Sequence, residues 1–346
     1  MSVIQSDLVF YGSVNMPDVD GATTGGALDT TKLITFADMA ANGVVNYVSS
    51  SASDVGVILT ATGRDTTGVL QSEAKTLTGT TPVAGTQSFL RLEKGVATGT
   101  AAVGDVAVIS NTAVVTGTAV AGSAASASLS AWITLASGQG ATVAIGQVIR
   151  ITNNSPAGVN FMLRRIVAID TVVTDRVYVN RDWGTVPTSA TTYGVYRGML
   201  FDLLPNLVTQ VRRPFYAASS DVIGGSTRNY YEKIFAVNTN TAFALTLASI
   251  LKQVDPSAGT LNFALTNVLN DTGTVANRQT VPASGITAFS SGAAPQTIAV
   301  PSPQNLPSGA APNAAGAQGV WLNLVLTAGL AATNTSFQMR ETGQTI

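Results

Sequence analysis

Between Gly146 and Tyr196 the chain has four short apolar runs, which constrain its fold more than any other feature. The runs are GQVIRITNN, FMLRRIVAID, DRVYVNRDWG and TTYGVYRG, and turn-forming Asn, Gly, Pro, Asp and Thr residues lie between them. No run has the length or the 3.6-residue period of an amphipathic helix. The stretch therefore predicts a small antiparallel unit of short strands over residues 146–198.

The composition of the whole chain favours sheets that pack through small side chains. Hydrophobic residues make up 45% of the sequence, but aromatic residues only 6% and charged residues only 11%. Ala, Val, Thr, Ser and Gly supply most of the rest, and such residues suit strands and turns better than thick helical cores. The length of 346 residues is enough for roughly two or three domains.

Period-two alternation extends the β prediction to both sides of the central stretch. Leu245 and Leu247, and further along Leu261 and Phe263, alternate with small or polar residues. We predict a mainly β, multi-domain chain whose short antiparallel strands form small β-barrel or β-sandwich domains, with a C-terminal Ig-like or jelly-roll sandwich. The expected segments are an N-terminal arm with edge strands (1–54), an Ala/Thr/Gly-rich β domain (55–145), the small antiparallel unit (146–198), a linker (199–228) and the sandwich (229–346).

Residues 95–149 have low complexity, and Asp105 is the only charged residue among them. Disorder is one interpretation of such a segment. Its many valines, together with Ile133 and Leu135, are more apolar residues than a solvated linker carries. We expect short strands here, packed closely or covered by a neighbouring subunit. Trp132 is the candidate anchor of an interface, and a place in the core is the alternative.

The chain contains neither Cys nor His, which excludes several kinds of chemistry. Disulfides, thiolate catalysis and Ser-His-Asp or Cys-His mechanisms need residues that are absent. Zinc sites lose their usual ligands. Asp18 and Asp20, with Asp29 at the twelfth position, match a calcium loop only in part, because Thr23 stands where that loop needs Gly. We predict a non-enzymatic protein with no cofactor and no metal.

Three carboxylates of the central stretch remain as candidates for acid–base chemistry. Asp170, Asp175 and Asp182 are close enough in sequence to act in principle as the paired carboxylates of a glycoside hydrolase. They fall at predicted turns or strand ends, however, where Asp commonly accepts local hydrogen bonds. The turn interpretation is the favoured one.

The charge balance argues against nucleic acid and membrane partners. The net charge is −1 and the isoelectric point about 5.4, so no sequence-wide attraction to polyanions is expected. No window offers the roughly 18 uninterrupted apolar residues of a spanning helix. The N-terminal MSVIQSDLVF lacks the basic start and apolar core of a secretory signal, which predicts a protein made in a cytoplasm.

Two pairs of adjacent basic residues, Arg164–Arg165 and Arg212–Arg213, are candidate interface residues. A strand directs successive side chains to opposite faces. One member of the first pair is therefore expected to be buried with a partner or to meet another subunit, since an unpaired buried charge is costly. Arg is also a favoured interface residue. A surface salt bridge is the simpler alternative.

The chain resembles virion structural proteins of tailed bacteriophages in two regions. The first combines residues 146–151, 164–167 and 177–183 with Pro187 and the Tyr-Gly-Val-Tyr sequence at 193–196. The second runs from the Tyr-Tyr-Glu-Lys sequence at 230–233 to the Gly-Val-Trp-Leu sequence at 319–322 and is similar to the Ig-like domains of such proteins.

The resemblance implies a capsid decoration, or cement, protein. Such a protein would be a homotrimer that binds the major capsid protein on the outer surface of the phage head, after synthesis in the host cytoplasm. A tail, baseplate, fibre or spike protein that binds the host surface is the alternative. Residues 1–30 or the Pro-rich stretch 301–313 are the expected contact arms, because an extended segment can add a strand to a partner's sheet.

Overall fold

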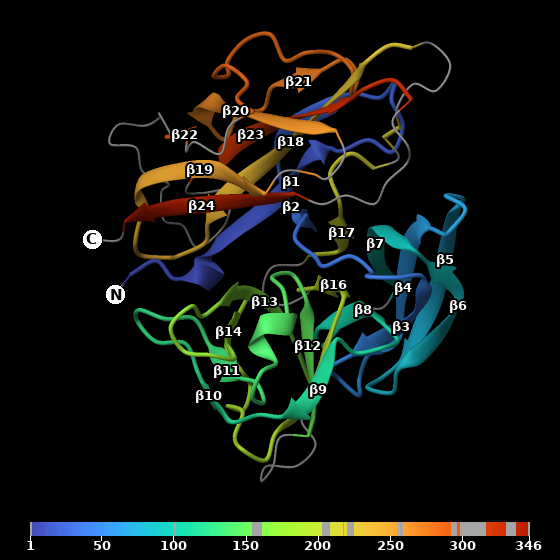
Figure 1. Cartoon of the computed structure of the whole chain (residues 1–346), viewed down its shortest axis with the longest axis vertical. Helices are drawn as coiled ribbons and strands as arrows, with labels where there is room; N and C mark the ends of the chain where they lie inside the picture. Colours follow the sequence, from blue (N-terminus) through green and yellow to red (C-terminus); the bar gives the residue numbers. More distant parts are fainter. Residues whose placement is uncertain are drawn as a thin grey trace. The chain divides into compact units, whose positions relative to one another are not determined.

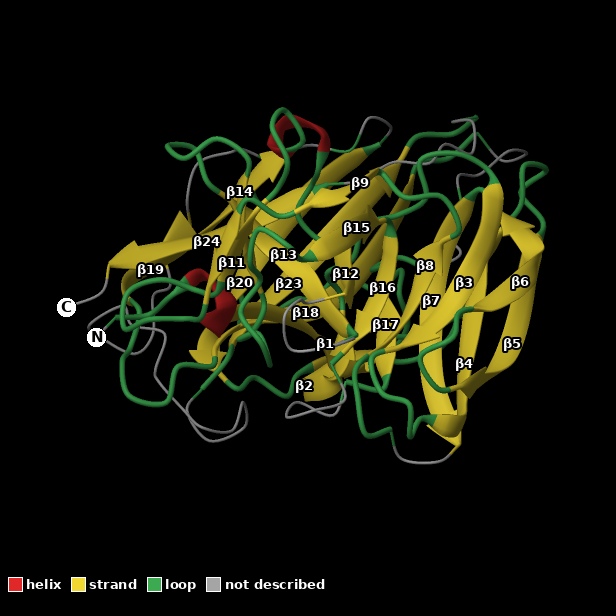
Figure 2. Ribbon diagram, turned by 90° about the horizontal axis from the view of Figure 1, so that it is seen from below, coloured by secondary structure: helices red, strands yellow, loops and turns green. Residues whose placement is uncertain are grey.

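The computed structural model describes residues 2–99, 102–153, 161–202, 208–216, 218–219, 225–254, 256, 259–291, 296–297, 316–329 and 337–344 (Figure 1). Strands dominate these residues (Figure 2), which contain two short 3-10 helices, η1 (Gln5–Asp7) and η2 (Gly140–Thr142), and no α-helix. Several small antiparallel sheets form, and none of them closes into a barrel within the described residues. The prediction of a mainly β, multi-domain chain is confirmed.

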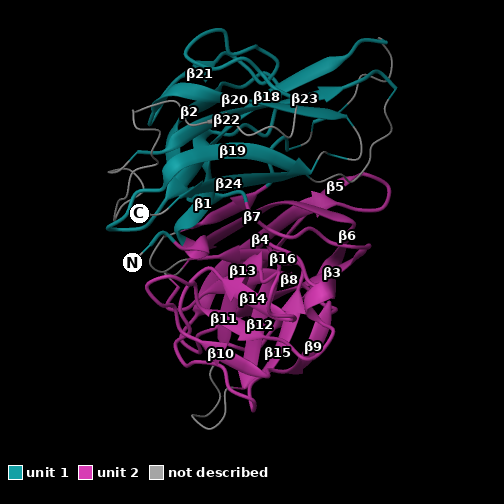
Figure 3. Ribbon diagram, turned by 60° about the vertical axis from the view of Figure 1, so that its left-hand side comes forward, with its two compact units in different colours: residues 1–3, 7–34, 213–346 teal, residues 4–6, 35–212 magenta. Residues whose placement is uncertain are grey.

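The chain divides into two compact units (Figure 3). Unit 1 comprises Met1–Val3, Asp7–Ile34 and Arg213–Ile346, and unit 2 comprises Ile4–Ser6 and Thr35–Arg212. Unit 2 is thus almost entirely an insertion in the chain of unit 1. These boundaries differ from the five segments expected from the sequence, because strands far apart in the chain belong to one unit.

Unit 1 is a β-sandwich. Its larger sheet has the order β20 (Thr260–Leu269), β23 (Gln318–Leu326), β18 (Arg228–Asn238), β1 (Leu8–Asn15) and β2 (Thr24–Leu33), with β21 (Thr274–Val275) paired to β2. Its smaller sheet has the order β22 (Gln296–Thr297), β19 (Thr246–Val254) and β24 (Gln338–Gln344). Apolar side chains of both sheets share one core, as the contact of Phe263 and Leu322 with the cluster of Ala248 and Ile250 shows.

The orientation predicted for one side chain of this sandwich, Leu247, is wrong. The sequence alternation placed Leu245 and Leu247 together, but Leu245 is buried and Leu247 is exposed with a φ of 48°. The positive φ changes the direction of the chain at the start of β19, so that Ala248 and Ile250 face the core instead.

The N-terminal segment is not a free arm. β1 lies between β18 and β2, and its register with β18 runs from Leu8 opposite Asn238 to Gly12 opposite Ile234. Tyr11, in the middle of β1, is buried. The expectation that residues 1–30 lie on another protein is therefore wrong for the two N-terminal strands. The other expected arm, 301–313, lies outside the described residues.

Unit 2 contains three groups of strands. The first has the order β17 (Gln210–Arg212), β7 (Arg91–Gly99), β4 (Val55–Arg64) and β5 (Leu70–Thr78). The second has the order β16 (Gly198–Phe201), β8 (Val106–Ser110), β3 (Gly43–Ser49) and β6 (Val83–Phe89). The linker predicted at 199–228 is wrong for β16 and β17, which are hydrogen-bonded members of these sheets.

The third group is a seven-stranded sheet that contains the predicted central unit. Its order is β10 (Ala121–Ser123), β11 (Trp132–Thr134), β14 (Arg176–Val179), β13 (Met162–Ile169), β12 (Val148–Asn153), β15 (Thr192–Tyr196) and β9 (Val115–Thr118). The two end strands are separated by only Ala119 and Val120, whose amides donate to Thr191 O and Thr134 O. The sheet therefore curls around its apolar core, and this curvature leaves little edge exposed to other chains.

Gly198 stands where β16 begins, and the structure leaves no room for a side chain there. Its φ is 144°, and a Cβ would lie 2.1 Å from Val108 O. We expect Gly198→Ala to lower the free energy of unfolding by more than about 2 kcal/mol, because steric overlap adds to backbone strain. Urea unfolding measures the loss. Gly138→Ala is the control: Gly138 also has a positive φ, 82°, but no heavy atom lies within 4 Å of its Cβ position, so a smaller loss of about 1 kcal/mol is expected.

Candidate interface and buried ionic clusters

Many of the charged side chains of this charge-poor protein are buried. The buried charged residues are Asp54, Glu73, Glu93, Asp105, Arg164, Arg165, Asp175, Asp202, Arg212, Glu232, Lys233, Lys252, Arg278 and Glu341. The whole chain has only 18 basic and 19 acidic residues. Buried charges need partners inside the protein, so the fold uses much of its charge internally and leaves less for its surface.

Arg164 takes part in a buried cluster around Asp105. Arg164 Nη1 lies 2.9 Å from Asp105 Oδ2, and Arg181 Nη2 contacts the same oxygen. Arg164 Nε also donates to Asp182 O at 2.9 Å, and the guanidinium lies over the ring of Trp183. Burial raises the pKa of Asp105 to about 6 despite the two guanidinium groups, and burial lowers the pKa of Arg164 to about 10. The cluster connects β13 to the turn before β8.

Arg165 takes part in a second cluster, around Asp202. Its Nη1 lies 3.3 Å from Asp202 Oδ2, and Asn180 Nδ2 donates to both Asp202 oxygens at 2.9 and 2.8 Å. Asn180 Oδ1 in turn accepts the backbone amide of Arg165. Both members of the predicted pair are therefore buried with an internal acidic partner. The alternative of a surface salt bridge is wrong for them.

Trp132 lies on a different part of the same curled sheet, in a group that we call the Trp132 patch: Trp132, Asp170, Arg176 and Tyr178. Trp132 is half-buried and pairs with Tyr178 across the β11–β14 ladder. The Arg176 guanidinium lies 4.2 Å from the Trp132 ring centroid, and Tyr178 donates to Asp170 Oδ2 at 2.7 Å. Trp, Tyr and Arg are the residues most often found at the centres of interfaces.

The remaining candidate arginines belong to other segments of the chain than the Trp132 patch. Arg212 ends β17, opposite Lys94 of β7, and is buried. Arg213 is half-buried and belongs to unit 1, whereas Arg212 belongs to unit 2. Within unit 2, the structure thus places Arg164 and Arg165 in two buried clusters and Trp132 in a separate group of side chains.

The local hydrogen bonding that the turn interpretation predicts is found for Asp170, whereas Asp175 and Asp182 accept amides from distant parts of the chain. Asp170 accepts the amides of Val172 and Val173, which lowers its pKa, and Asp175 accepts those of Gly138 and Gly140. Asp182 likewise accepts a backbone amide, that of Ala125. The three carboxylates share none of these hydrogen-bond partners.

The acidic residues of the partial calcium motif pair with basic side chains of the protein itself. Asp20 Oδ1 lies 3.8 Å from Arg278 Nη1, and Asp29 Oδ2 lies 3.0 Å from Lys32 Nζ. Hydrogen bonds from Thr31 and the Lys32 ammonium outweigh burial and lower the pKa of Asp29. No group of three or more acidic side chains able to hold a metal ion occurs within the part of the chain that the structure describes.

Three buried cations of unit 1, Arg278, Lys233 and Lys252, were not predicted from the sequence. Arg278 is fully buried, donates to Tyr216 O at 2.6 Å and lies 3.7 Å from Glu232 Oε1. Lys233 Nζ lies 2.6 Å from Asp271 Oδ2 and faces the ring of Trp321; burial lowers its pKa, and Asp271 opposes that effect. The one sequence signal of these buried charges was the Glu-Lys pair inside the apolar run of β18. Successive side chains of a strand point to opposite faces, so the two charges cannot both face water.

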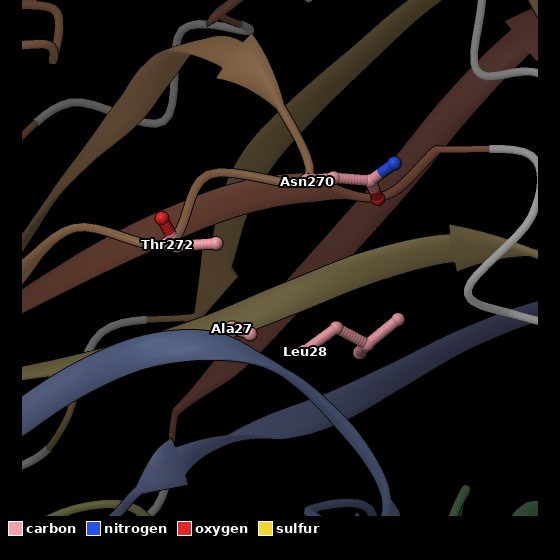
Figure 4. Close-up of a pocket in the computed structure, with 4 residues that line it drawn as sticks. All are labelled: Ala27, Leu28, Asn270 and Thr272. Carbon is pink, nitrogen blue, oxygen red and sulfur yellow. The ribbon is translucent and has the colours of Figure 1, made fainter.

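A hollow of about 330 Å³ lies beside β2 and is lined by Ala27, Leu28, Asn270 and Thr272 (Figure 4). None of these four lining residues has an acidic or basic side chain.

The outward side of three strands in unit 2 forms a surface that we call the neutral face: Ile58, Thr60, Ser72, Ala74, Thr76 and Thr98. Across the β4–β5 and β4–β7 ladders Ile58 pairs with Thr76 and Thr98, Thr60 with Ala74, and Ser72 with the buried Thr62. Ser72, Ala74, Thr76 and Thr98 are exposed. The alternating residues Val57, Leu59 and Ala61 are buried on the other side. Glu73 also points inward, where it accepts the amide of Thr86. The result is a patch of small uncharged side chains on regular strands, bordered on β7 by the half-buried Lys94, which lies opposite Thr62.

The described part of the chain contains no helix with the length and apolar character needed to cross a bilayer. No protein-family model, curated protein or solved structure matches this chain, so the geometry of its own residues carries the functional argument.

Proposed function

We propose that this chain is a non-enzymatic virion structural protein of a tailed bacteriophage, and that it decorates the capsid. It binds the outer surface of the head and stabilises contacts between neighbouring capsomers. The observation that carries the proposal is the neutral face, a patch of small uncharged side chains on regular strands in a protein that buries many of its charges. The likeness of residues 146–196 and 230–322 to virion proteins with Ig-like domains supports the same class.

A decoration protein acts by burying surface against its partner. A standard interface buries about 1,600 Å² in total, and charged groups are depleted at the centre of such interfaces. The Thr, Ser, Ala and Ile residues of the neutral face suit the centre of an interface, because burying them desolvates no charged group. A homotrimer that presents three such faces to the major capsid protein gains avidity without further contacts. Neither nucleic acid nor a membrane has a part in this role.

Charges placed on the neutral face test the proposal. We expect Ala74→Glu and Thr76→Lys to reduce binding to undecorated heads by more than tenfold, since each introduces a charge that the interface must desolvate. Both positions are exposed, so stability should change by less than about 0.5 kcal/mol. Co-sedimentation of purified protein with heads measures the binding.

The matched control is Ser137→Lys, which adds the same charge as Thr76→Lys at an exposed position in the turn after β11, outside the strands of the neutral face. It should bind heads as the unaltered chain does. Full occupancy of heads by both neutral-face variants would remove this face as the contact.

A tail or baseplate protein that binds the host surface is the second candidate. It is favoured by the Trp132 patch, where a half-buried Trp lies against an Arg and a Tyr. Electron microscopy of particles that carry labelled protein separates the two roles. Labels on the shell support decoration, and labels on the tail support host binding.

A further inference from the structure

The strand β24 is weakly anchored in the sandwich of unit 1. It lies at the edge of the three-stranded sheet and, among the described residues, pairs with β19 alone. Its sequence, QMRETGQ, offers a single apolar side chain, Met339, which packs against the core. Gln338, Arg340 and Gln344 are exposed. Edge strands with so little apolar burial belong to the least stable parts of a fold.

Glu341 is the residue of β24 that points into the core. It lies opposite Ile250 of β19, a buried member of the apolar cluster, and is itself only 9% exposed. Both carboxyl oxygens are buried without a hydrogen-bond partner among the described residues. An ionised carboxylate in such a place is strongly disfavoured. Burial accordingly raises the pKa of Glu341 to about 8.

The charged groups near this core do not neutralise Glu341. Lys252 lies one step along the inward face of β19, but its ammonium donates to Leu261 O at 2.8 Å and Ser291 O at 2.6 Å. Across the sandwich, Glu232 faces inward from β18 and lies beside Arg278. The strands β20 and β23 contain no charged residue, and Arg340 of β24 itself is exposed.

We propose that β24 is a detachable strand, which stays docked on β19 while the Glu341 carboxyl is protonated and separates from it when that carboxyl ionises. The docked strand holds the carboxyl in an apolar core, whereas the separated strand exposes it to water. Ionisation therefore stabilises only the separated state. The inference rests on the burial of Glu341 and the edge position of β24, and it does not depend on the proposed function.

The direction of the pH effect follows from the two pKa values. The carboxyl has an ordinary value of 4.5 in the separated strand and a value of about 8 in the docked strand. Docking is therefore fully favourable below pH 4.5 and is progressively weakened as the pH rises to about 8. Between pH 6 and pH 8 the equilibrium constant for separation should rise about fiftyfold.

Hydrogen exchange of the full chain, followed by mass spectrometry and corrected for the intrinsic effect of pH on exchange, tests this proposal. In the unaltered chain, the protection of β24 should fall about fiftyfold between pH 6 and pH 8. In Glu341→Gln and Glu341→Leu, which cannot ionise, protection should stay within about twofold over the same range. Two variants are used so that failure of one to fold leaves the test intact.

Gln338→Glu is the matched control, because it places a carboxyl on an exposed position of the same strand. It should keep the full pH dependence of the unaltered chain. Constant protection of β24 in the unaltered chain between pH 6 and pH 8 would overturn the proposal. An unchanged pH dependence in the two Glu341 variants would overturn it as well.

Discussion

Deletion of residues 7–15 is expected to unfold unit 1 as a whole. The deletion removes β1 from between β18 and β2, so both neighbouring strands lose their ladder partner. The buried Tyr11 is lost with it. Buried backbone groups without partners are costly, and a gap in the middle of a sheet cannot be closed by small shifts. The expected result is loss of the entire unfolding transition of unit 1.

Circular dichroism and limited proteolysis measure this result. Unit 2 should persist as a protease-resistant core, since nearly all of it lies within residues 35–212. Deletion of residues 2–3, which precede every strand, is the control and should leave both units folded. If removal of residues 7–15 left the unit 1 transition intact, the N-terminal segment would be a dispensable arm after all.

Asp202→Ala is expected to cost about 3–5 kcal/mol of stability, because it leaves the buried Arg165 guanidinium without its acidic partner. The substitution also removes both acceptors of Asn180 Nδ2. Urea unfolding of unit 2 measures the change. The double variant Arg165→Met with Asp202→Leu should recover most of the loss, since a pair of apolar side chains can replace a buried ion pair.

Lys75→Met provides the control for this experiment. Lys75 is paired with Glu73 at 2.9 Å, but its side chain is 25% exposed, and Glu73 keeps its bonds to Thr86. Pairs of this kind contribute less than about 1 kcal/mol. A loss of similar size in Asp202→Ala would mean that water reaches Arg165 and compensates its charge.

The division of the chain into two units also implies an order of folding. The strands of unit 1 come from both ends of the chain, so its larger sheet is complete only after unit 2 has been synthesised. Long-range pairing of this kind is slow, because a long loop has to close before the contacts form. Unit 2 is the part of the chain that can fold first.

Local sequence patterns were sufficient to predict those parts of the structure that depend on residues close together in the chain. The four runs between Gly146 and Tyr196 became β12 to β15, because alternation and turn residues act within a few positions. The turn role of Asp170 was likewise predictable, since its carboxylate accepts the nearby amides of Val172 and Val173. The absence of Cys and His determined which chemistry the chain lacks.

The tertiary structure alone decided which strands belong together and which charges are buried. Leu8 meets Asn238, and Arg165 meets Asp202, through pairings that no local period encodes. The direction of Leu247 depended on one positive φ, and Glu341 became an internal acid only because β24 pairs with β19. The alternation of apolar and polar residues specifies which side chains of a strand share its apolar face. The partner that covers that face is selected by free energy summed over the whole chain, and so it appears only in the folded protein.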